Sequence, residues 1–190
     1  MLFETPRLQA FVLRSSHAKA LSSYYKANHE HLAPWEPLRP DNYHSVDSWL
    51  TRCREFESEH NAGSALRVVG IQKNETSIAC VCNFTNISRG PFQACNMGYS
   101  ISQALGGQGI MTEFAEAATN YVFEKIELHR IMANYVTQNV RSARVLEKIG
   151  FEKEGYAKSY LKIAGTWRDH VLTAKINPRH AEANKHRMIK

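Results

Sequence analysis

The sequence contains no apolar run long enough to cross a membrane, and its first residues lack the basic stretch and long apolar core of a signal peptide. It also contains no dense run of lysine and arginine, and only 4 of its 190 residues are cysteine. These absences argue against a membrane protein, a secreted disulfide scaffold and a dedicated DNA-binding protein. We therefore expect a cytoplasmic location, with no membrane partner and no direct DNA binding.

The cysteines are too few and too closely spaced to predict a metal site. Cys80 and Cys82 are separated only by Val81, so in a strand their side chains share one face. A metal knuckle normally needs two or more intervening residues. With Cys53 and Cys95 equally isolated, we expect buried free thiols and no metal.

The composition predicts an ordinary globular protein, with 43% hydrophobic and 22% charged residues. Its formal net charge of +6 is compatible with an anionic cofactor, a ribosomal surface or nucleic acid, and proves none of them. We predict one domain over residues 1–176 and a basic, frayed C-terminal tail over 177–190.

Hydrophobic periodicity predicts an α/β (α+β) protein with the element order βααβββαβαββ. Ser15 and Ser16 offer an N-cap for the first helix, and Ser45 begins the second. Alternating apolar residues predict strands at 8–14, 65–71, 78–84, 95–101, 129–136, 152–161 and 170–176. The result is a mixed, mostly antiparallel sheet of about seven strands with four helices.

A glycine-rich turn, Gly106-Gly107-Gln108-Gly109, joins the strand ending at Ile101 to a helical pattern that reaches Lys125. Backbone N–H groups at such a turn can converge on a phosphate. The turn can equally be a tight connection that needs glycine for its dihedral angles. The loop alone leaves both interpretations open.

The strands on either side of this helix should be parallel, because a helix crosses between them. If they splay at their C-terminal ends, they form a slot beside the helix N-terminus, suited to an extended phosphate-bearing cofactor. Asn139 and Ser142 follow the second strand, at the mouth of this slot. Asn139 is either a cofactor contact or simply the N-cap of the next helix.

A second candidate region is the stiff loop Pro34-Trp35-Glu36-Pro37. It is either a packed connector with Trp35 in the core or one wall of an active site.

Several runs together are far more specific than the glycine loop. They are Gly98-Tyr99-Ser100-Ile101, Gly107-Gln108-Gly109-Ile110-Met111-Thr112-Glu113, Asn139-Val140-Arg141-Ser142, Leu32 to Pro37, His129 to Tyr135, Gly150 to Lys158 and Trp167 to Ala174. With this pattern the chain resembles the GNAT-type N-acetyltransferases over essentially its whole length. Within them it is most similar to the RimJ/RimL group of protein N-terminal acetyltransferases, and to its RimJ type.

The resemblance implies the GNAT fold with splayed central parallel strands, acetyl-CoA as donor and no metal. It implies transfer to the N-terminal alanine of a ribosomal protein, the fifth of the small subunit, on the ribosome or an assembly intermediate. The implied cofactor contacts are the backbone of Tyr99, Ser100 and Ile101, the amides of Gly107, Gln108, Gly109, Ile110, Met111 and Thr112, and Asn139 and Ser142.

The sequence departs from the wider family at the positions that carry side-chain chemistry. Ala104 and Gly106 replace polar residues of the pyrophosphate motif, so binding of the pyrophosphate should depend on backbone N–H donors. Leu146 stands where many relatives carry a thiolate-protonating tyrosine, so Ser142 is the substitute acid. Asn96 and Leu161 stand where relatives carry a glutamate base. Glu36 is the expected base, with Asp169 and His170 as alternatives.

The lack of an obvious catalytic base itself favours an N-terminal α-amine as the acceptor. An α-amine with a pKa of about 7.7–8.0 is roughly one-tenth neutral at pH 7, whereas about four lysine amines in ten thousand are. Two other functions stay open: a GNAT enzyme for another amine, such as a polyamine, antibiotic or peptide, and a non-catalytic ribosome-binding factor.

Overall fold

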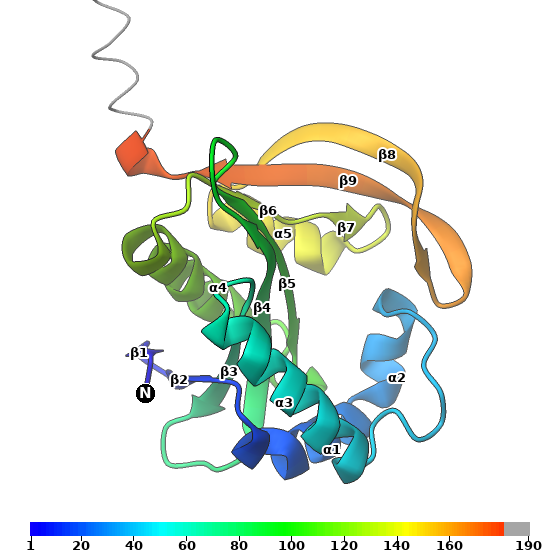
Figure 1. Cartoon of the computed structure of the whole chain (residues 1–190). Helices are drawn as coiled ribbons and strands as arrows, with labels where there is room; N and C mark the ends of the chain where they lie inside the picture. The colour runs from blue at the N-terminus through cyan, green and yellow to red at the C-terminus, as the bar shows by residue number, and fades with distance from the viewer. Residues whose placement is uncertain (181–190) are drawn as a thin grey trace, which may run out of the picture.

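The computed structural model describes residues 1–180, which form a nine-stranded sheet with helices on both faces (Figure 1). The sheet order is β1-β2-β3-β4-β5-β6-β9-β7, and β8 pairs with the other edge of β9. The strands are β1 Phe3–Glu4, β2 Leu8–Val12, β3 Leu66–Gln72, β4 Ile78–Ser88, β5 Ala94–Ile101, β6 Arg130–Met132, β7 Tyr135–Val136, β8 Glu152–Ile163 and β9 Thr166–Ile176. The predicted mixed and mostly antiparallel sheet is confirmed, because β5–β6 is the parallel pair in it.

The α-helices are α1 Ala18–Ala27, α2 His29–Leu32, α3 Val46–Asn61, α4 Ile110–Tyr121 and α5 Val140–Lys148. Short 3-10 turns cover Ser15–His17, Ala33–Trp35 and Gln103–Leu105, and a π-turn over Val122–Ile126 extends α4. The element order therefore follows the prediction, with β1 and α2 added and the strand expected at 129–136 divided into β6 and β7.

The first two predicted helices begin differently in the structure. Ser45 caps α3, because its side chain accepts a hydrogen bond from the Ser48 N–H. The predicted cap of α1 by Ser15 and Ser16 is wrong. Both residues lie inside the 3-10 turn that leads into the helix, and α1 starts without a side-chain cap.

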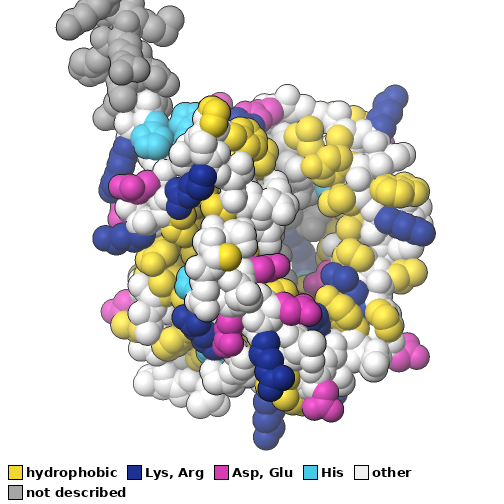
Figure 2. Space-filling view, viewed as in Figure 1, with side chains coloured by type: hydrophobic (Ala, Val, Ile, Leu, Met, Phe, Trp, Pro, Cys, Tyr) yellow, Lys and Arg dark blue, Asp and Glu magenta, His cyan; other side chains and the backbone are white. Residues whose placement is uncertain are grey.

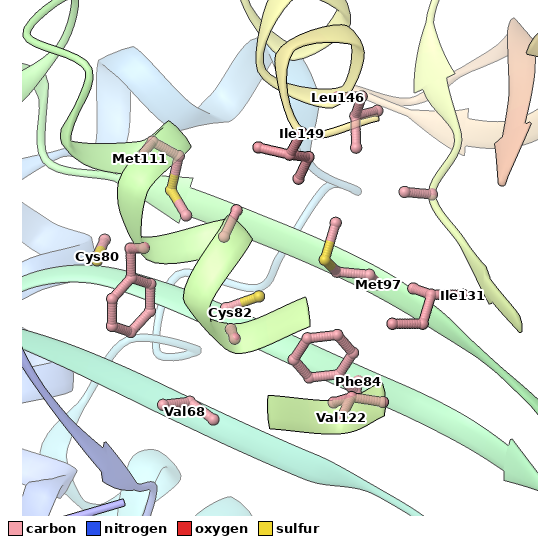
Figure 3. Close-up of a cluster of buried hydrophobic side chains, with 14 of the residues drawn as sticks. Val68, Cys80, Cys82, Phe84, Met97, Met111, Val122, Ile131, Leu146 and Ile149 are labelled. Carbon is pink, nitrogen blue, oxygen red and sulfur yellow. The ribbon is translucent and has the colours of Figure 1, made fainter. Parts of the chain in front are cut away.

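Alternate residues of the central strands face two different hydrophobic cores, one on each side of the sheet. Val68, Cys80, Cys82 and Phe84 face α4 in the larger core, shown with Met97 and Met111 in Figure 3. Their neighbours Val69 and Val81 face α1 and α3 on the other side. Cys80 and Cys82 share a face as predicted, and all four cysteines are buried and free.

The two parallel strands separate as the slot requires. β5 pairs with β6 only from Ala94 to Asn96, after which its remaining residues, Met97 to Ile101, pair with β4 alone. β6 leaves because the chain bends at Ala133–Asn134, where Ala133 exchanges hydrogen bonds with Thr173 and the Asn134 amide oxygen accepts from the Thr173 N–H. One edge of β5 beyond Asn96 is consequently open.

The first residue after β9 is anchored to the body of the protein. Asn177 is buried, and its amide donates to the carbonyl oxygens of Phe123 and Leu128. The predicted tail therefore begins with an anchored residue, and its part from 181 to 190 lies outside the described residues. Within residues 1–180, no helix combines the length and apolarity needed to cross a membrane, and no group of three or more metal-ligating side chains occurs.

Candidate active site

The glycine loop places four amides at the N-terminus of α4. Gly107 and Gly109 have positive φ angles of 78° and 75°, and Gly109 is the N-cap residue. The amides of Leu105 and Gly106 are used in the preceding 3-10 turn. Within the described residues, the amides from Gly107 to Ile110 have no protein acceptor. Free amides at the positive end of a helix form an anion site.

Three neighbouring side chains turn away from this anion site. Ile110 and Met111 bury their side chains in the larger core, below α4. The Gln108 side chain turns back to donate to the Ala104 carbonyl oxygen. The positions of these side chains are consistent with the expectation that backbone N–H groups bind the pyrophosphate.

Sequence reasoning missed Arg7, which lies between β1 and β2 and reaches this loop. Its guanidinium donates to the Gln108 carbonyl oxygen at 2.8 Å and to the Glu113 carboxylate at 2.7 Å. The Arg7 backbone N–H donates to the same carboxylate at 3.0 Å. No spacing rule could have found this pair, because 106 residues separate its members.

Replacing Gly107 by alanine should weaken CoA binding more than it weakens the fold. A Cβ there meets no atom within 4 Å, so the cost is only the positive φ, about 1–2 kcal/mol. Relieving that strain would rotate the amides of the anion site. Calorimetric titration with CoA and a thermal melt separate the two effects.

Gly63→Ala is the matched control, since Gly63 also has positive φ and open space but lies after α3. Equal melting shifts with unchanged CoA affinity in both variants would show that the loop amides do not hold the cofactor.

The open edge of β5 carries Tyr99, which spans the slot to α5. The Tyr99 hydroxyl lies 2.8 Å from the Ser142 Oγ and donates to the Ser142 carbonyl oxygen at 3.1 Å. Burial raises the pKa of Tyr99 well above its usual value, although the bond with Ser142 opposes this. Tyr99 is therefore a neutral group that fixes the Ser142 hydroxyl in the slot.

The start of α5 has the capping structure that the sequence left open. The Asn139 side-chain oxygen accepts from the Ser142 N–H at 3.0 Å, so Asn139 is the N-cap. Its amide nitrogen keeps its donors, and capping does not exclude a cofactor contact. Leu146 is buried in the core, so it supplies no substitute for the family's tyrosine.

Ser100 points to the opposite face of β5 from Tyr99. Its hydroxyl lies 2.9 Å from the Tyr24 hydroxyl on α1. Two cavities of about 550 Å³ and 210 Å³ lie on this side, and Glu36 lines both. Figure 2 shows the molecule hollowed between the β8–β9 arm and the helices, with hydrophobic side chains around the opening.

The loop that carries Glu36 is held from both sides. The Glu36 carbonyl oxygen accepts from the Ala164 N–H at the β8–β9 turn, at 2.8 Å. The His44 ring stacks on Tyr25, and Ser22 donates to the His44 carbonyl oxygen. Trp35 is 37% exposed, so the packed-connector interpretation of this loop is wrong for its tryptophan.

Of the three predicted bases, Glu36 is the one that lines the two cavities. Burial raises the pKa of its carboxyl, although Arg39, His29 and Arg52 nearby pull it down. The Asp169 carboxylate accepts from the Tyr156 hydroxyl and the Ser159 N–H, and these bonds lower its pKa. His170 is buried, and its Nδ1 pairs with the Arg168 carbonyl oxygen.

These groups fit an acyl-CoA thioester with an amine opposite it. The anion site suits a pyrophosphate, and the open edge of β5 can pair with an extended pantetheine arm. The slot with Ser142 and the cavities with Glu36 lie on opposite faces of β5. Donor and acceptor can therefore approach the sheet from two sides.

Comparisons with known proteins agree with this geometry. The model of the Acetyltransferase (GNAT) domain family matches residues 7–152. The [ribosomal protein uS5]-alanine N-acetyltransferase of Escherichia coli K12 is 44% identical over 174 residues, covering 92% of this chain and 90% of that protein.

Two solved structures are similar over most of their length. The ribosomal-protein-S5-alanine acetyltransferase of Vibrio fischeri has 40% identity and a TM-score of 0.89, covering 92% of this chain and 96% of that one. RimJ of Mycobacterium smegmatis, solved with CoA-disulfide, has 29% identity and a TM-score of 0.86, covering 92% and 88%. The chain belongs to the GNAT acetyltransferase family and is an acyltransferase that uses acetyl-CoA.

Proposed function

We propose that this enzyme acetylates the N-terminal α-amine of a ribosomal protein, with the alanine of the fifth small-subunit protein as its acceptor. The observation that carries the proposal is the 44% identity, over 92% of the chain, to an enzyme named for that reaction. The proposed setting is the cytoplasm, on the free protein, the ribosome or an assembly intermediate.

The proposed chemistry is direct attack of the neutral amine on the thioester carbonyl in a ternary complex. Holding both reactants on β5 supplies proximity, and main-chain N–H groups along its open edge stabilise the oxyanion. Glu36 accepts the amine proton, directly or through water. The Ser142 hydroxyl, held by Tyr99, donates a proton to the departing CoA thiolate.

The cavities beside Glu36 support a peptide acceptor. The larger one is lined by the end of α1, by α2 and by the 33–45 loop, and the smaller one by α1, α3, the same loop and strands β3 and β4. Both are larger than one amine needs. Leu38, which lines the larger cavity, is exposed, and the β8–β9 arm carries the exposed side chains Tyr160 and Trp167. A chain terminus can lie there with its first residue inside and the following residues over the rim.

Purified enzyme with acetyl-CoA should add one acetyl group to a peptide that has the N-terminal sequence of the fifth small-subunit protein and begins with alanine. Mass spectrometry should place this group on the α-amine. The control peptide has the same sequence with a blocked N-terminus and an internal lysine, and it should stay unmodified.

In cells, intact-mass analysis of ribosomal proteins from a deletion strain should find one N-terminus 42 Da lighter, the mass of an acetyl group. Complete acetylation of every ribosomal protein in that strain would exclude the proposed acceptor.

A further inference from the structure

Arg7 is held rigidly where it meets the glycine loop. It follows Pro6 in the turn between β1 and β2, where the Thr5 side chain accepts from the Leu8 N–H at 3.0 Å. The Arg7 carbonyl oxygen accepts from the Lys73 N–H at 3.2 Å. The guanidinium therefore starts from a fixed backbone position.

Glu113 presents a difficulty for an anion site in this place. It lies in the first turn of α4, beside the amides that have no protein acceptor. A carboxylate there is favourable for the helix. It nevertheless repels a pyrophosphate and can compete for the same donors.

Arg7 contacts both oxygens of this carboxylate. The Arg7 N–H donates to one carboxylate oxygen at 3.0 Å, and its Nε donates to the other at 2.7 Å. The Nη2 of the same guanidinium lies 2.6 Å from that second oxygen. Both oxygens of Glu113 thus point at Arg7, and its negative charge is matched by a neighbouring positive one.

The fourth contact orders the loop itself. The Arg7 Nη1 donates to the Gln108 carbonyl oxygen at 2.8 Å. In a trans peptide the C=O and the following N–H point in opposite directions. Fixing the Gln108 carbonyl oxygen on Arg7 therefore turns the Gly109 N–H away from Arg7.

We propose that Arg7 is a positioning residue for the pyrophosphate of acetyl-CoA, which neutralises Glu113 and fixes the Gln108–Gly109 peptide so that the loop amides accept the anion. The proposal rests on the proposed cofactor site. Arg7 acts through Glu113 and the loop, and its own contact with phosphate is not required.

The test compares Arg7→Met, Glu113→Gln and the double variant, which has the net charge of the wild type. Each is assayed with acetyl-CoA and with S-acetylpantetheine, which lacks the pyrophosphate. Arg7→Met should raise KM for acetyl-CoA about tenfold with kcat nearly unchanged, because an unmatched carboxylate then faces the pyrophosphate. The double variant should have a KM for acetyl-CoA at least threefold lower than that of Arg7→Met. On the free-energy scale this restores about half of the tenfold loss.

The two alternatives give different results. If Arg7 binds phosphate directly, the double variant stays as poor as Arg7→Met. If Arg7 is only structural, kcat/KM for S-acetylpantetheine falls as far as it does for acetyl-CoA. Either result overturns the proposal, whereas recovery in the double variant with unchanged use of S-acetylpantetheine supports it.

Arg130→Met is the matched control, because it breaks another arginine–glutamate pair, with Glu154 on β8, away from the loop. It should leave KM for acetyl-CoA unchanged. CoA titration of the wild type comes first: no binding there contradicts the proposed function itself, whereas binding that Arg7→Met does not weaken contradicts only the role of Arg7.

Discussion

Glu36→Gln should lower the rate of N-terminal acetylation about a hundredfold at pH 6 and less than twofold at pH 9. An α-amine is mostly protonated at pH 6, so a base must remove its proton before attack, whereas at pH 9 it is already neutral. Burial raises the pKa of Glu36, which moves its basicity toward the working pH. Steady-state rates between pH 6 and pH 9, with saturating acetyl-CoA, measure the difference.

The matched control is Glu30→Gln, the same change on α2 at an exposed carboxylate. Its pH profile should follow the wild type. Parallel profiles for Glu36→Gln and the wild type across this range would remove Glu36 from the mechanism. The proton would then leave to solvent.

Phe114→Ala should destabilise the protein by about 3–5 kcal/mol, the cost of removing a buried phenyl ring from a close-packed core. Phe114 is 0% exposed on the inner face of α4. Its ring lies 5.7 Å from that of Phe3 and directly over Gly70, where an added Cβ would come within 2.8 Å of it. Urea denaturation of both proteins measures the loss.

The same variant should also lose affinity for CoA, because α4 carries the anion site at its N-terminus. Phe92→Ala is the control, since Phe92 is 52% exposed in the β4–β5 turn region and should change stability by less than about 0.5 kcal/mol. A Phe114→Ala protein as stable as this control would show that α4 is not anchored through Phe114.

Local patterns predicted most of the elements, because each reports a contact made a few residues away. Val68 and Val69 alternate between the two cores as a period of two requires. The glycines at 107 and 109 predicted a turn with positive φ, which the structure has. The errors arose where tertiary contacts compete with local preference, as at Ser15, which lies in a 3-10 turn and whose N–H donates to the Glu57 carboxylate on α3.

The strand predicted at 129–136 shows the same limit. Apolar residues recur along it, but Thr173, far away in sequence, bonds to Ala133 and Asn134 and divides the strand there. That break is what opens the edge of β5. The cap that the sequence offered at Asn139 is confirmed, because its partner Ser142 lies within one helical turn.

The sequence by itself determined most of the helices and strands, the glycine turn and the family, since periodicity and motif spacing are properties of neighbouring residues. Only the tertiary structure decided how the site is assembled. It placed Arg7 on Glu113, joined Tyr24 to Ser100, brought Tyr99 to Ser142 and closed the Glu36 loop on Ala164. The physical reason is that each contact joins residues 43 to 128 positions apart in the sequence. Such contacts depend on how the layers pack, and no local sequence pattern predicts them.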